Sequence, residues 1–188
     1  MPFIVLYDAC VLHPAALRDL LVWTGIFRLC QVKWTQRILD ECFRSILRQR
    51  PDLNPEKLAR TRDQLERAIP DVQVTGYEDL IEGITGLPDP DDRHVVAAAI
   101  RCGAQVIVTF NLKDFPRSVL SRYGMEAQHP DDFMRDLIDL DEAAVAHVVR
   151  AQAAALKNPP RTPAEVLDVL GRQGLTVSAA MLRELLGV

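Results

Sequence analysis

Apolar and polar positions along the chain predict strands and helices in turn. The continuous apolar runs Phe3–Tyr7 and Gln105–Thr109 predict buried strands. Apolar residues at helical spacing predict a helix over Thr35–Gln49, with its first residue as N-cap, and another over Arg93–Cys102. Strands that alternate with helices are typical of an α/β fold. We therefore expect three layers, α/β/α, around a central and mostly parallel sheet.

Weaker patterns predict the remaining elements. Further helices are expected over His13–Thr24, Asn54–Ala68, Glu78–Ile84, Arg117–Arg122 and Pro130–Asp139, and short strands over Val72–Val74 and Met125–Ala127. After Asp141 the pattern changes to an Ala-rich helix, a Pro-rich break and two short amphipathic helices: Glu142–Leu156, Lys157–Pro163, Pro163–Gly171 and Ser178–Leu186. The sequence thus predicts one domain over residues 1–140 and a helical C-terminal extension over residues 141–188.

Composition narrows the class of protein. The chain is 48% hydrophobic, enough for a core, but no apolar run approaches the ~20 residues of a membrane span. The N-terminus enters the first strand without a basic leader, which argues against a signal peptide. The four cysteines have neither C-x-x-C nor zinc-finger spacing, so we expect small buried side chains in a reducing compartment. A cytoplasmic protein with no membrane partner is the expectation.

Charge is unevenly distributed along the chain. The net charge is −4, yet residues 1–75 carry net +2 and residues 76–140 carry net −6. Lys and Arg are dense between Arg28 and Arg67, which suggests a surface that faces phosphate groups. The acidic excess falls in the segment that holds several candidate metal ligands, where bound cations would offset it.

Acidic and amide side chains recur where strands end. Asp8 follows the first strand, Asn111 and Asp114 follow the second buried strand, and Asp92 opens a helix. Parallel α/β sheets place their sites at the carboxyl ends of strands, and Mg²⁺ prefers oxygen ligands. Each residue alone could equally form a turn or cap a helix. Together they predict a divalent-metal site.

Other polar residues leave alternatives open. Glu41 borders an apolar helix face and so needs a partner, but Asp40 competes for the same role. Asp89, Asp91 and Asp92 cluster at a helix N-terminus, where capping explains at least one of them but three acids exceed what one cap needs. Two histidines, His13 and His94, could contact a phosphate or leaving group, although a structural role is commoner for such residues.

The order of these motifs resembles the PIN-domain family, and most closely its VapC-like nuclease toxins. The resemblance covers residues 3–135 and rests on Val5–Leu12, an acid within a helix, Asp89–Ala99 and Val108–Phe115. It implies that an acidic quartet is catalytic and binds metal, joined by an amide ligand: Asp8, Glu41, Asp92 and Asp114, with Asn111. Cys10 stands where many relatives have an alcohol or Asn.

The resemblance also implies an activity. It predicts an endoribonuclease that uses Mg²⁺ or Mn²⁺, with RNA as substrate, and the toxin of a toxin–antitoxin pair with a cognate antitoxin as partner; it also allows a homodimer. The residues alone support only metal-assisted hydrolysis of a phosphate ester. One alternative is a non-catalytic PIN-like module that binds nucleic acid or protein. A phosphatase of another α/β fold would need a second Asp where Cys10 stands.

Overall fold

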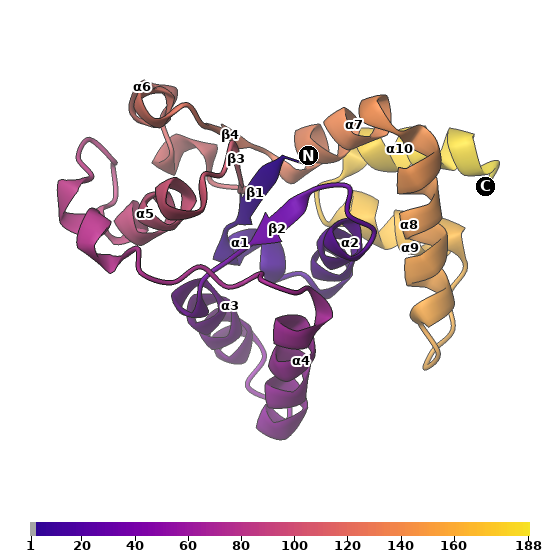
Figure 1. Ribbon diagram of the computed structural model, residues 1–188. Helices are drawn as coiled ribbons and strands as arrows, with labels where there is room; N and C mark the ends of the chain where they lie inside the picture. The colour runs from indigo at the N-terminus through magenta and orange to yellow at the C-terminus, as the bar shows by residue number, and fades with distance from the viewer. Residues whose placement is uncertain (1–2) are drawn as a thin grey trace.

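A four-stranded sheet forms the centre of the computed structural model, which describes residues 3–188. The strands are β1 (Ile4–Tyr7), β2 (Gln31–Lys33), β3 (Val106–Val108) and β4 (Glu126–Gln128). They pair in the order β2-β1-β3-β4, and each of these pairs is parallel (Figure 1). Parallel neighbours require crossover connections, which the helices supply. The predicted α/β fold with a parallel sheet is confirmed.

Helices cover both faces of this sheet. They are α1 (Ala9–Leu12), α2 (Ala15–Ile26), α3 (Gln36–Gln49), α4 (Pro55–Ala68), α5 (Arg93–Cys102), α6 (Arg117–Leu120), α7 (Pro130–Leu140), α8 (Glu142–Ala155), α9 (Pro163–Arg172) and α10 (Thr176–Leu186). Short 3₁₀ helices are η1 (Glu78–Gly83), η2 (Pro90–Asp92), η3 (Leu112–Asp114) and η4 (Ser121–Tyr123). Helix α5 lies on one side of the sheet, and α2 with α8 lies on the other (Figure 1).

Local sequence signals explain where several helices begin and end. Thr35 caps α3, because its hydroxyl accepts a hydrogen bond from the Ile38 N–H at 3.0 Å. Asn54 caps α4 in the same way. Helix α5 ends at Gly103, whose φ of 70° lies in the left-handed region that glycine tolerates. These predicted boundaries are confirmed.

Other short elements differ from the prediction. Val72–Val74 does not form a strand, and only a single bridge joins Gln73 to Trp34. The segment predicted as a brief helix at residues 78–84 is the 3₁₀ helix η1. Strand β2 and helix α1 were not predicted, since each is too short for its periodicity to be read.

The C-terminal helices share one hydrophobic core with the sheet and its covering helices. Helix α8 packs along α2, and α10 packs beside α7. The link to α10 is polar: Asp131 of α7 accepts hydrogen bonds from the Val177 N–H at 3.0 Å and the Ser178 N–H at 2.8 Å. A carboxylate from α7 therefore caps the N-terminus of α10. The domain boundary at residue 140 stays a prediction.

Candidate metal centre at the strand ends

Strands β1 and β3 end side by side and bring Asp8 against Thr109. The Asp8 N–H donates to the Val108 carbonyl at 3.1 Å, so Asp8 continues the ladder by one position. Its Oδ1 accepts from the Ala9 N–H at 2.7 Å and caps α1. Its Oδ2 accepts from the Thr109 hydroxyl at 2.8 Å. Asp8 is only 7% exposed, and these contacts fix the direction of its carboxylate.

A second layer of hydrogen bonds supports Asp8. Cys10 donates through Sγ to Asp8 Oδ2 at 3.1 Å and accepts from the Phe110 N–H at 3.3 Å. Burial first, and then the charge of Asp8, raises the pKa of Cys10 to about 12, so the thiol keeps its proton and acts as a donor. The Asn111 N–H donates to the Thr109 hydroxyl at 3.0 Å. Cys10 thus supplies a second side-chain hydrogen bond to the Asp8 carboxylate.

Thr109 is a site residue that the sequence reasoning missed. It stands at the end of β3, directly before the segment that contains Asn111. Its position at a strand end is the signal that could have identified Thr109. The signal applies to hydroxyl groups that orient a carboxylate as well as to side chains that bind a metal directly.

Glu41 of α3 faces the N-terminus of α5 through His94. The Glu41 Oε1 atom accepts from His94 Nε2 at 3.1 Å and from Arg37 Nε at 3.2 Å. Burial alone would raise the pKa of Glu41, but the hydrogen bonds and charges of His94 and Arg37 hold the pKa below its ordinary value. His94 is 1% exposed, which favours the structural role over contact with a phosphate. It orients Glu41 instead.

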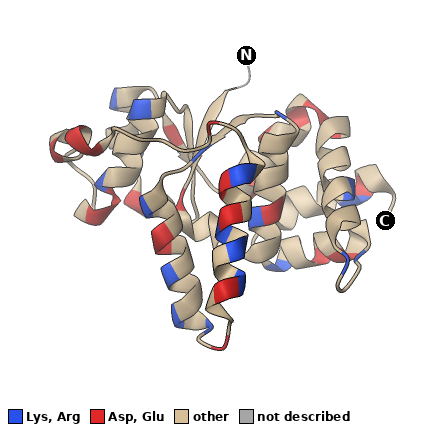
Figure 2. Cartoon of the chain, turned by 60° about the horizontal axis from the view of Figure 1, so that its bottom comes forward, with Lys and Arg blue, Asp and Glu red and all other residues tan. Residues whose placement is uncertain are grey.

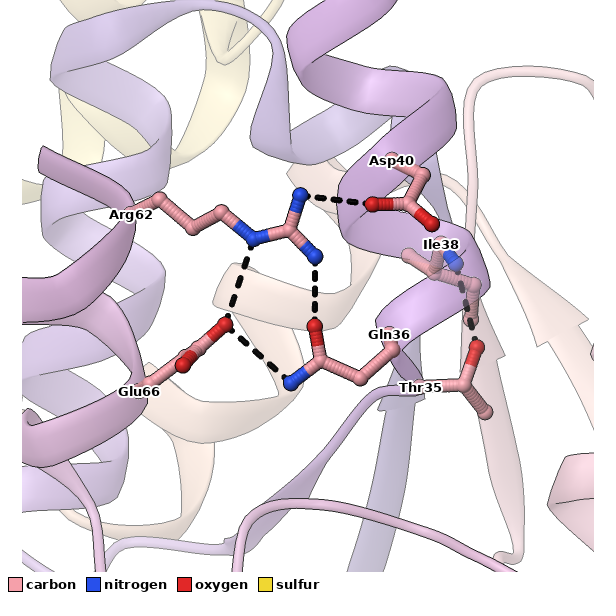
Figure 3. Close-up of polar contacts among 6 residues, drawn as sticks. All are labelled: Thr35, Gln36, Ile38, Asp40, Arg62 and Glu66. Carbon is pink, nitrogen blue, oxygen red and sulfur yellow. Dashed lines mark hydrogen bonds and ion pairs between the residues drawn. The ribbon is translucent and has the colours of Figure 1, made fainter. Parts of the chain in front are cut away.

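Asp40, the competitor of Glu41, points towards a different helix. Arg62 of α4 donates to Asp40 Oδ1 at 2.6 Å and to Glu66 Oε1 at 3.2 Å (Figure 3). Gln36 joins the same network through Glu66 at 3.1 Å. This cluster ties α3 to α4. The geometry favours Glu41 over Asp40 as the acid of α3 that serves the site.

The basic residues between Arg28 and Arg67 do not form a uniformly positive surface. Red positions are interspersed with blue ones along α3 and α4 (Figure 2). Three of the arginines make ion pairs with acids of the same segment: Arg37 with Glu41, Arg50 with Asp52, and Arg62 with Asp40 and Glu66. Such pairs neutralise part of the positive charge of this segment at short range, and the phosphate-facing surface stays a prediction.

The three acids before α5 divide into two roles. Asp89 caps η2, because its side chain accepts from the Asp91 N–H at 2.9 Å, while Asp91 is exposed. Asp92 occupies the N-cap position of α5, yet its side chain makes no capping hydrogen bond. Burial raises the pKa of Asp92 to about 6, and the charges of Asp8, Asp89 and Asp114 add to the rise. The Asp92 carboxylate thus lies among negative charges, which the charge of His94 offsets only in part.

These side chains surround one cleft of about 400 Å³. Its lining includes Asp8, Cys10, His13, Glu41, Asp92 and Asn111. Asp114 in η3 is not part of the lining, although its charge acts on Asp92. Across residues 3–188, no three His, Cys, Asp or Glu side chains converge at the spacing of a formed metal site. The donors are hard oxygens with unbalanced negative charge, and this chemistry fits Mg²⁺ or Mn²⁺.

A parallel α/β sheet with an acidic cleft at the carboxyl ends of its strands is the architecture of a PIN-type domain. The PIN domain family matches residues 4–113, more than half of the chain, and the chain belongs to that family. A second family, described as the VapC50 C-terminal domain, matches residues 130–184. The chain is therefore a PIN-domain protein, and its C-terminal helices are similar to the VapC50 C-terminal domain.

One curated relative matches part of the chain. It is described as "Putative ribonuclease VapC50" from Mycobacterium tuberculosis, and it is 48% identical over 98 residues. The match covers 52% of this chain and 57% of that relative, so it spans little more than half of either protein. No solved structure matches. Within residues 3–188, no helix has both the length and the apolar character needed to cross a membrane.

Proposed function

We propose that the protein is a metal-dependent endoribonuclease that hydrolyses RNA phosphodiester bonds, and that it is the toxin of a toxin–antitoxin pair. The observation that carries this proposal is the cleft itself: Asp8, Glu41 and Asp92 line it from three separate elements of a PIN domain. RNA as the substrate rests on the relative described as a ribonuclease and on its VapC name.

Each acid has a separate role in this proposal. Asp8, Asp92 and Asp114, with the Asn111 amide, hold Mg²⁺ or Mn²⁺ by their side-chain oxygens. A bound divalent ion lowers the pKa of water and offsets charge on the scissile phosphate. Thr109 and Cys10 keep the Asp8 carboxylate in one orientation for this task.

The Oε2 atom of Glu41 either accepts a proton in the proposed reaction or binds the metal. Both of its hydrogen bonds reach Oε1, so Oε2 is left for the cleft. The lowered pKa keeps this carboxylate ionised at neutral pH, able to accept a proton from water or to join the ligands.

A cleavage assay tests the activity. Purified protein is incubated with end-labelled RNA in Mg²⁺, Mn²⁺ or EDTA, and the products are resolved on a denaturing gel. We expect cleavage only with a divalent ion, and loss of cleavage in Asp8→Asn and Asp92→Asn. The matched control is Asp40→Asn, which removes one carboxylate that is bound to Arg62 outside the cleft. Equal cleavage by wild type and both cleft variants would contradict the assignment.

Expression in bacteria tests the toxin role. The protein expressed alone should arrest growth, and Asp8→Asn or Asp92→Asn should relieve the arrest. Co-expression of a cognate antitoxin should also relieve it, and the two proteins should then purify together. Equal growth arrest by wild type and both variants would show that the acids do not cause the toxicity.

A non-catalytic binding module is the second candidate. The observation that favours it is that residues 3–188 contain no three ligands already at metal-site spacing. This reading predicts that Mn²⁺ leaves the melting temperature unchanged. The nuclease proposal predicts a clear Mn²⁺-dependent rise, because a ligand that binds only the folded state stabilises it.

A further inference from the structure

A second hollow lies where the turn between α7 and α8 meets the end of α10. Its volume is about 620 Å³, larger than that of the acidic cleft, and the two share no lining residue. Five apolar side chains contribute to its lining: Ile138, Leu140, Ala143, Met181 and Leu185. Leu140 is 72% exposed, the highest value among the large hydrophobic side chains of residues 3–188. A single exposed Leu is ordinary, but here it stands beside other apolar groups in a hollow.

The rim of this groove is acidic. It carries Asp139, Asp141, Glu142 and Glu184, and no Lys or Arg contributes to the lining. None of the four makes an ion pair within residues 3–188. Asp141 caps α8 through the Ala144 N–H at 2.9 Å, and Glu142 lies in the first turn of α8, so helix stability explains these two.

Helix stability does not explain Asp139 and Glu184. Both lie in the last turn of their helices, α7 and α10, where the partial negative charge of the helix end disfavours a carboxylate. The two helices run parallel, because Asp131 near the start of α7 binds the start of α10 and the groove lies at the C-terminal end of both. Two negative helix ends and two unpaired acids therefore converge on one groove that apolar and acidic side chains line together.

We propose that this groove docks a basic amphipathic segment of a partner protein, with Lys or Arg side chains on the rim and an apolar side chain on the floor. The charge complementarity selects this occupant: RNA carries the same sign as the rim and is repelled, whereas a basic segment neutralises it. Apolar floors with charged rims are the pattern of helix-in-groove recognition. The proposal is independent of the nuclease function.

Fluorescence anisotropy with a labelled synthetic peptide tests this docking. The peptide consists of Lys and Leu, spaced so that a helix carries Lys on one face and Leu on the other. The double variant Asp139→Lys/Glu184→Lys should bind it at least about tenfold more weakly than wild type, equal to about 1.4 kcal/mol. The matched control is Glu78→Lys/Asp79→Lys, which makes the same charge change at exposed positions of η1, a segment packed on α5. This control should bind like wild type.

A Leu140→Ser variant, melting curves and light scattering provide further checks of the docking. A Leu140→Ser variant should also weaken binding, since it removes the exposed apolar contact without a change in charge, and melting curves should show that all variants fold. Equal binding by wild type and the groove double variant would overturn the proposal, and so would an equal loss in the η1 control. Light scattering tests whether a second copy of the chain fills the groove instead. If wild type is a dimer and Asp139→Lys/Glu184→Lys is a monomer, a second copy is the occupant and the proposal is overturned.

Discussion

The substitution Asp92→Asn should stabilise the metal-free protein while it removes the proposed activity. Asp92 has an ordinary pKa of 3.8 that the fold raises to about 6, because burial and the charges of Asp8, Asp89 and Asp114 oppose ionisation. Each tenfold change in proton affinity is worth about 1.4 kcal/mol, so the ionised carboxylate costs about 3 kcal/mol at neutral pH. Solvent screening of this half-buried group lowers the cost to about 1–2 kcal/mol.

An opposing effect must be subtracted from this gain. Asp92 stands at the N-terminus of α5, where a negative charge is favourable by about 0.3–1 kcal/mol. The repulsion is the larger effect, so the net gain from Asp92→Asn is about 1 kcal/mol. For a chain of this length that corresponds to a rise of about 2–4 °C in melting temperature.

The difference in stability between Asp92→Asn and wild type should depend on pH. A raised pKa in the folded state means that the wild-type contribution of Asp92 is most favourable below the unfolded value of 3.8 and is lost as the pH rises through about 6. In EDTA, Asp92→Asn should therefore exceed wild type in stability at pH 7 and lose that advantage towards pH 4. Urea unfolding at several pH values measures this difference.

Two results would contradict the proposed role of Asp92. A variant that is less stable than wild type in EDTA at pH 7 would show that Asp92 is not under net repulsion in the cleft. Addition of Mn²⁺ should raise the melting temperature of wild type more than that of the variant, because the ion binds the charge that the variant lacks. An equal rise in both proteins would show that Asp92 does not hold the ion.

Three further substitutions test other contacts. Asp131→Ala should lower the free energy of unfolding by about 2–4 kcal/mol in urea, since it removes the cap of α10 and leaves buried donors unpaired; an unchanged midpoint would refute the capping role. Thr109→Val should cost about 1–3 kcal/mol and slow RNA cleavage, because Asp8 loses a donor; cleavage at the wild-type rate would contradict this. Glu41→Gln should slow cleavage by about 10²–10⁴-fold if Glu41 accepts a proton, whereas Asp40→Asn should not; equal rates for these two variants would restore Asp40 as a candidate.

The fold was largely predictable because its strong elements carry clear periodicity. The apolar run at Phe3–Tyr7 and the amphipathic stripe of Thr35–Gln49 identified β1 and α3 to within a residue or two. Strand β2 was missed because its sequence Gln31-Val32-Lys33 buries a single residue, and its pairing with β1 comes from tertiary contacts.

The candidate site was predictable as a set of acids but not as a network. The position of Asp8 at a strand end follows from the sequence, since parallel strands align their carboxyl ends. Which acid of α3 faces the cleft depends on where Arg62 and His94 lie, and both are distant in sequence from Glu41. Side-chain direction on a helix that borders two neighbours is set by packing, which one sequence does not reveal.

The hydrogen bond between Asp8 and Thr109 joins residues 101 positions apart. Strand β3 lies between β1 and β4, so one edge of β1 has no partner strand until β3 has been synthesised. At about 5–20 residues per second, the ribosome needs on the order of 5–20 s to pass from Asp8 to Thr109. A nascent chain is therefore unable to assemble the acidic cleft for most of its synthesis. Premature termination directly before β3 would release a fragment that contains Asp8, Glu41 and Asp92 but lacks Thr109 and Asn111.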